Sequence, residues 1–134
     1  MLVFQFRREG VGEQAVLRPR LGVLMSQEGF SVEASALLDS GADHSILPAF
    51  VANLLKLKRG RSVRTYGIGD ATEGYESSVD ITFVDANQQH ETVTEVPIYV
   101  IPGITAVVIG RKKIFDMFRI TFEQFQSRIL LERT

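Results

Sequence analysis

A carboxylate, a hydroxyl and a glycine follow one another directly after an apolar run, at Asp39, Ser40 and Gly41. The carboxylate of Asp39 can take up or release a proton, and the hydroxyl of Ser40 can both donate and accept a hydrogen bond. Gly41 leaves room for a tight turn or for another backbone segment. A carboxylate held in a polar turn at the end of a strand is suited to acid–base chemistry on a bound water.

The same three residues have a simpler interpretation as an ordinary turn. Asp, Ser and Gly are common between a strand and a helix, where the Asp side chain bonds the backbone that follows it. Three residues alone favour the simple turn, so the rest of the chain has to decide between the two interpretations.

Composition limits the classes of function. The chain has 134 residues, of which 45% are apolar and 23% charged, as is typical of one globular domain. It has no cysteine, which excludes disulfides and thiolate metal sites, and its two histidines are too few for a His-based metal site. A net charge of -1 gives no overall attraction to nucleic acid or to an anionic membrane. We therefore expect no metal, no cofactor and no nucleic-acid or membrane partner.

The location of the protein is predicted from two further features. No apolar run approaches the ~20 residues that a membrane helix needs. The first residues place Arg7 and Arg8 after the apolar stretch, which is the reverse of a signal peptide. We expect a cytoplasmic protein.

The elements that must position Asp39 are mostly strands. Apolar residues recur with period two, and Gly and Pro separate the segments, which predicts an all-β barrel or sandwich. The segments with this pattern or with a high β content are 2–6, 21–26, 30–38, 79–84, 93–101, 106–109 and 119–122.

Two short helices are also predicted. One covers Pro48–Leu57, with Phe50, Leu54 and Leu57 on its apolar face and Val51 and Leu55 beside them. The other covers Lys112–Phe118. A basic run at Lys56–Arg64 follows the first helix. It allows a nucleic-acid interface, but it lacks interleaved aromatic residues, so a solvated loop is the preferred interpretation.

Three segments resemble the retropepsin-like aspartic proteases, in the order of that family. Residues 36–48 resemble the active-site loop, which has an apolar strand, Asp-Thr/Ser-Gly-Ala, a second Asp and an apolar pair. Residues 65–70 are similar to the glycine-rich tip of the flap hairpin. Residues 106–111 and the helical segment after them are similar to the C-terminal strand, Gly-Arg pair and short helix. The resemblance covers roughly residues 18–122, and it implies a closed acid-protease-like barrel with a flap hairpin.

The resemblance also implies a role for each matching residue. Asp39 is the expected catalytic residue, and the side chain of Arg111, which follows Gly110, is expected to pair with Asp43 and support the loop. The remaining expected site residues are Ser40, Gly41, Ala42 and Asp43 of the active-site loop and Gly67, Ile68 and Gly69 of the flap, which bind substrate.

Aspartic proteases use two carboxylates that share one proton, and the chain holds a single Asp-Thr/Ser-Gly motif. We therefore expect one retropepsin-like domain over residues 1–134, with a core at about 18–122 and a C-terminal extension at 123–134. The expected function is that of an aspartic endopeptidase that acts on peptides as a homodimer. The dimer is expected to cover the apolar terminal segments. The alternative is a non-catalytic peptide-binding or scaffold module on the same fold.

Overall fold

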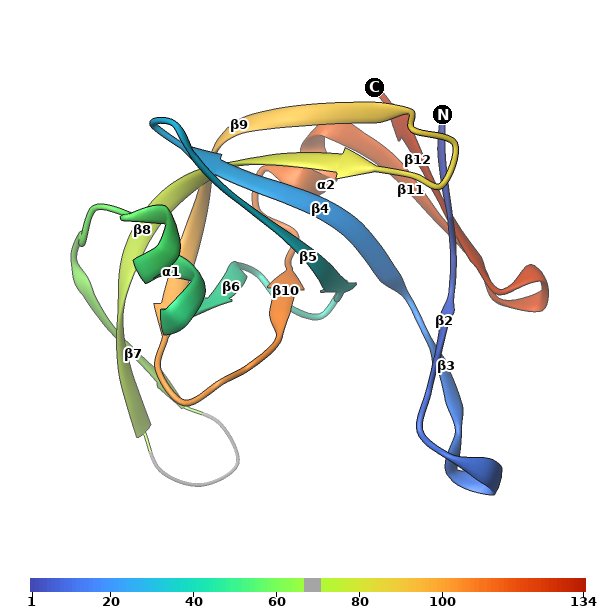
Figure 1. Cartoon of the computed structure of the whole chain (residues 1–134), viewed down its shortest axis with the longest axis horizontal. Helices are drawn as coiled ribbons and strands as arrows, with labels where there is room; N and C mark the ends of the chain where they lie inside the picture. Colours follow the sequence, from blue (N-terminus) through green and yellow to red (C-terminus); the bar gives the residue numbers. More distant parts are fainter. Residues whose placement is uncertain (67–70) are drawn as a thin grey trace.

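A closed β-barrel forms the body of the protein (Figure 1). The computed structural model describes residues 1–66 and 71–134. Barrel strands follow the order β4-β5-β10-β6-β9-β8, and β8 pairs back with β4 to close the barrel. Their bounds are β4 Arg20–Gln27, β5 Phe30–Leu38, β6 Ser45–Pro48, β8 Ala71–Val84, β9 His90–Ile101 and β10 Val107–Ile109. The all-β barrel that the sequence predicts is confirmed.

Three smaller structures extend from the barrel. Strand β7 (Ser62–Tyr66) pairs with the first part of β8 and makes the long hairpin expected for a flap. A separate three-stranded sheet has the order β1-β12-β11, and β2 and β3 form a hairpin of their own. The bounds of these strands are β1 Leu2–Gln5, β2 Arg7–Glu9, β3 Val16–Arg18, β11 Phe118–Glu123 and β12 Arg128–Arg133. The helices are α1 Ala49–Leu55 and α2 Ile114–Met117, with 3-10 turns at Gly12–Gln14 and Gln124–Gln126.

The core fills the barrel and continues under the terminal sheet. Alternation in β4 buries Leu21, Val23 and Met25, as the period-two pattern predicts, and leaves Gly22 exposed. Phe83 of the barrel and Phe118 at the start of β11 meet edge to face, with ring centroids 5.6 Å apart. The terminal sheet is therefore packed onto the barrel by a continuous apolar core.

Helix α1 corrects one prediction. It begins at Ala49, so Pro48 precedes it. Its expected apolar face is wrong at Phe50 and Leu54, which are 55% and 59% exposed, whereas Leu57 packs against the core. The buried residues of the helix are Val51 and Leu55, which were expected beside that face, and Ala52. The helix has only seven residues. The side on which β5 and β6 pack against it decides which of its residues are buried.

The two ends of the chain pair with each other. Leu2 of β1 lies opposite Leu131 of β12, and β12 also pairs along β11, so it is the central strand of this sheet. The C-terminal extension thus supplies strand β12 of this sheet. Pairing within one chain satisfies many of the backbone hydrogen-bonding groups of the terminal segments, which we expected a dimer to cover.

Candidate active site

The loop that carries Asp39 crosses one end of the barrel. It connects β5 to β6, and β10 lies between these two strands, parallel to β5 and antiparallel to β6. Because Leu38 is paired with Ile109, Asp39 leaves the sheet at a fixed point, and its N–H donates to the Ile109 carbonyl at 2.9 Å. The strand pairing therefore fixes the backbone of Asp39.

A tight turn fixes the carboxylate of Asp39. The N–H of Gly41 donates to Asp39 Oδ1 at 2.8 Å, and the N–H of Ala42 points to the Asp39 carbonyl at 3.3 Å. A Cβ atom at Gly41 would lie 3.2 Å from the same Oδ1 atom, so glycine gives the turn room. The turn and the chemical interpretation are therefore compatible, because the turn orients a half-buried carboxylate beside exposed Ser40 and Gly41.

Gly110 packs directly beneath the loop. A Cβ atom there would lie 2.4 Å from the carbonyl oxygen of His44 and 2.9 Å from that of Ala42. The N–H of Gly110 donates to Ser45 Oγ at 3.0 Å, and Ser45 is fully buried. Sequence reasoning did not single out Ser45, and a serine between a histidine and an isoleucine carries no signal of this contact.

Arg111 holds the loop through its backbone and its side chain. Its N–H donates to the Ala42 carbonyl at 2.8 Å, and the N–H of Lys112 donates to the Asp43 carbonyl at 2.8 Å. The guanidinium of Arg111 donates to the carboxylate of Asp43, so the expected contact between these side chains is present. Because both side chains are more than half exposed, this ion pair orients the loop more than it stabilises the fold.

His44 is held by an aromatic contact. Its ring stacks on the ring of Tyr99 of β9, with centroids 4.1 Å apart and planes 15° from parallel. The loop is thus tied to β9 as well as to β10 and to the residues that precede α2.

The flap residues that the resemblance implies, Gly67, Ile68 and Gly69, lie outside the described residues. The two strands that lead to them are described. Ser62 lies opposite Tyr75, and Tyr66 lies opposite Ala71, which confirms a hairpin here. Tyr66, at the end of β7, is 78% exposed.

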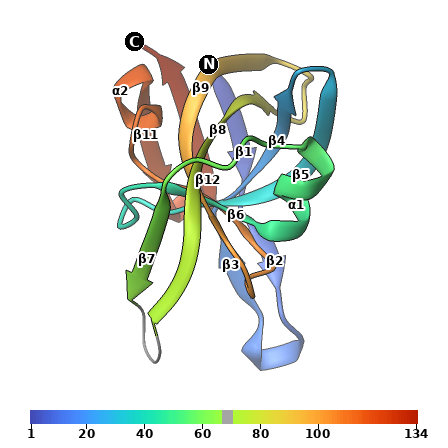
Figure 2. The same cartoon turned by 90° about the vertical axis from the view of Figure 1, so that its left-hand side faces the viewer.

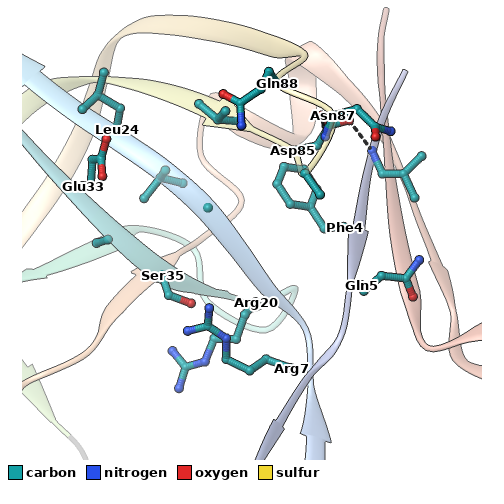
Figure 3. Close-up of a pocket in the computed structure, with 16 residues that line it drawn as sticks. Phe4, Gln5, Arg7, Arg20, Leu24, Glu33, Ser35, Asp85, Asn87 and Gln88 are labelled. Carbon is teal, nitrogen blue, oxygen red and sulfur yellow. Dashed lines mark hydrogen bonds between the residues drawn. The ribbon is translucent and has the colours of Figure 1, made fainter.

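A groove of about 860 Å³ lies away from Asp39, between β1 and the β4–β5 hairpin (Figure 3). Its one buried carboxylate, Asp85, accepts the N–H groups of Val3, Asn87 and Gln89 at 3.3, 2.9 and 3.0 Å. This side chain is therefore occupied in fastening β1 to the β8–β9 turn. Across residues 1–66 and 71–134, no group of three or more His, Cys, Asp or Glu side chains is arranged to hold a metal ion.

Side chains of the basic run lie along the barrel surface. Lys56 Nζ lies 4.8 Å from the ring centroid of Phe30, and the guanidinium of Arg59 lies 4.6 Å from that of Tyr75.

Neither described helix is long and apolar enough to cross a membrane.

Comparison with known proteins places these features in a family. Residues 15–118 match the family model described as retroviral aspartyl protease. The EIAV protease in complex with the inhibitor HBY-793 has a TM-score of 0.51 and 28% identity over 79% of this chain and 93% of that one. The retroviral protease-like domain of Ddi1 from Leishmania major has a similar fold, with a TM-score of 0.54 and 17% identity over 87% and 90% of the two chains. No curated protein sequence matches the chain. The family match includes every strand of the barrel, the Asp39 loop and its supports, so the chain belongs to the retroviral aspartyl protease family.

Proposed function

We propose that the protein is an aspartic endopeptidase that works as a homodimer, with Asp39 of each chain forming half of the catalytic pair. The observation that carries the proposal is the intact Asp39-Ser40-Gly41 turn at the end of β5, inside the segment that matches the family. The supports of the turn, above all Gly110 and Arg111, give the carboxylate a defined direction.

The proposal needs a second copy because one carboxylate cannot act as base and acid in the same step. Asp43, the nearest acidic residue along the loop, already accepts a hydrogen bond from the guanidinium of Arg111. No other Asp of the sequence is followed by Ser-Gly or Thr-Gly. A twofold axis beside Asp39 would supply the second carboxylate from the same residue of the partner.

The proposed reaction is the hydrolysis of a peptide bond. Two adjacent carboxylates hold one proton between them, since two like charges at short range repel. The ionised carboxylate takes a proton from a water molecule, and the water oxygen bonds to the carbonyl carbon while the other carboxylic acid gives its proton to the carbonyl oxygen. The C–N bond then breaks as the nitrogen takes the proton held by the first carboxylic acid, and a hydroxyl of the diol returns a proton to the other carboxylate. A carboxylic acid and an amine leave, and the pair again holds one proton.

A comparison of wild type with Asp39→Asn on a peptide library tests the proposal. Asparagine keeps the shape of the side chain but cannot take up the proton, so we expect cleavage to fall by about 1,000-fold or more. Asp116→Asn is the matched control, because it makes the same change on an exposed side chain of α2 and should leave cleavage unchanged.

Two outcomes would overturn the proposal. Equal cleavage by wild type and Asp39→Asn would show that Asp39 is not catalytic. Peptide binding without cleavage by either protein would support the alternative, a peptide-binding module on the protease fold.

A further inference from the structure

The β2–β3 hairpin, residues 7–18, is a separate arm on the barrel. Its strands pair only with each other among the described residues, with Arg7 opposite Arg18 and Glu9 opposite Val16. An isolated two-stranded hairpin is at best marginally stable in water. An arm of this kind gains stability when another surface covers it.

The arm exposes apolar side chains near its tip and along β3. Val11 is 88% exposed, and Val16 and Leu17 are 47% and 48% exposed. Val16 and Leu17 are neighbours in a strand and so point to opposite faces of the hairpin. Both faces of the arm therefore present apolar surface that one chain leaves uncovered.

Glu9, the last residue of β2, joins the arm to Arg20 of the barrel and also pairs with Arg18 within the arm. Glu9 Oε1 accepts from Arg20 Nη2 at 2.7 Å and from Arg20 Nε at 3.1 Å, and Arg18 Nε lies 3.2 Å from Glu9 Oε2. Arg20 is the first residue of β4, and the Arg20 and Glu9 side chains are only 19% and 28% exposed. Ion pairs that are partly buried are screened less by salt, so they hold the arm in a defined direction.

The arm and the β7–β8 hairpin extend from the same side of the barrel (Figure 1). Both hairpins project beyond the loop between β5 and β6, which carries Asp39, one on either side of it (Figure 1). In the view turned by 90°, both hairpins again extend downward from the barrel, and the loop lies above them and to the left (Figure 2). A molecule that approaches the Asp39 loop from the side of the two hairpins therefore also meets the arm (Figure 1, Figure 2).

We propose that the arm is a subunit contact, and that its apolar side chains are buried against a second copy of this chain. The inference rests on the proposed function, because a catalytic pair of Asp39 residues requires the partner to approach this loop. The terminal strands already pair within the chain, so they leave the dimer in need of further contacts, and the arm projects where they are needed. A net charge of -1 per chain opposes such an association only weakly.

Charge substitutions on the arm test the inference. Val16→Asp places a charge on one face of the arm and Leu17→Asp places one on the other face. Each change occurs twice in a twofold dimer. At least one of them should raise the dimer dissociation constant by about 100-fold in analytical ultracentrifugation. Phe30→Asp at the start of β5 is the matched control, since Phe30 is 40% exposed and the β4–β5 turn lies away from the arm in both Figure 1 and Figure 2, and it should leave the constant unchanged.

The chain contains no cysteine, so Val11→Cys labels the tip of the arm alone. A photoreactive cross-linker attached there should join two chains of the dimer, and mass spectrometry of the product should show partner peptides. A dimeric wild type whose association neither arm variant weakens would overturn the inference, and so would an arm label that attaches only within its own chain.

The same measurements separate this inference from the proposed function. A dimer that survives both arm variants overturns the arm contact and leaves the homodimeric peptidase intact. A monomeric arm variant that cleaves peptides at the full wild-type rate supports the arm contact and overturns the shared Asp39 pair. A wild type that stays monomeric at all concentrations overturns both.

Discussion

Gly110→Ala should damage the active-site loop by a steric effect whose size follows from the structure. The added Cβ would lie 2.4 Å from the His44 carbonyl oxygen and 2.9 Å from the Ala42 carbonyl oxygen. An ordinary contact between carbon and another heavy atom is about 3.5 Å, so the backbone of the loop must move by about 1 Å. Both neighbours are backbone atoms, which cannot rotate away as the end of a side chain can.

The movement affects the hydrogen bonds that hold the loop. Overpacking of this kind costs about 1–3 kcal/mol, and the weakened bond from Gly110 to the buried Ser45 hydroxyl adds about 1 kcal/mol. We therefore expect Gly110→Ala to lower the free energy of unfolding by about 3 kcal/mol. Peptide cleavage should fall as well, since the shift reaches Asp39 through Ala42.

Denaturant unfolding at one fixed protein concentration measures this effect, because association of subunits also contributes to stability. Gly29→Ala is the control. Gly29 has φ +89° and no atom within 4 Å of an added Cβ, so its substitution carries backbone strain of about 1–2 kcal/mol and no clash. A Gly110→Ala protein as stable as wild type would refute the close packing of this loop.

Three further experiments test the supports of the fold and the site. A double-mutant cycle of Asp43→Ala and Arg111→Ala should give a coupling energy of about 0.2–1 kcal/mol in thermal or denaturant unfolding, because the ion pair is exposed. A coupling energy of zero would show that the two side chains do not interact in solution. Asp85→Ala should lower the free energy of unfolding by about 2–3 kcal/mol, since three N–H groups lose their acceptor; an unchanged denaturant midpoint would contradict this. Ser45→Ala should cost about 1–3 kcal/mol in the same assay, because the N–H of Gly110 is left buried without a partner, and a neutral result would remove that contact from the account.

The sequence predicted the strands because burial on one face leaves a period-two pattern. The alternation of Leu21, Val23 and Met25 identifies β4, and the buried ends of β5 and β10 identify the strands beside Asp39. The contact between Asp43 and Arg111 was expected from the resemblance, and local chemistry alone would not have given it, since 68 positions separate the two residues.

Features that depend on long-range packing could not be predicted in this way. The buried face of α1 was wrong because a helix of two turns has too few residues to define an apolar stripe, and Phe50 and Leu54 look like core residues. The pairing of β1 with β12 joins the two ends of the chain, and nothing in either segment specifies its partner. The hydrogen bond between Gly110 and Ser45 likewise joins distant segments through a backbone group.

A subunit-mixing experiment tests most directly whether two chains share one catalytic site. Wild type is held at a fixed concentration, and inactive Asp39→Asn is added in excess and left until the subunits have exchanged. With a ninefold excess, most wild-type chains then have an inactive partner, so cleavage should fall to about one-tenth of its starting rate. A rate that stays unchanged at every ratio, although the subunits exchange, would show that each chain carries a complete site and would contradict the account.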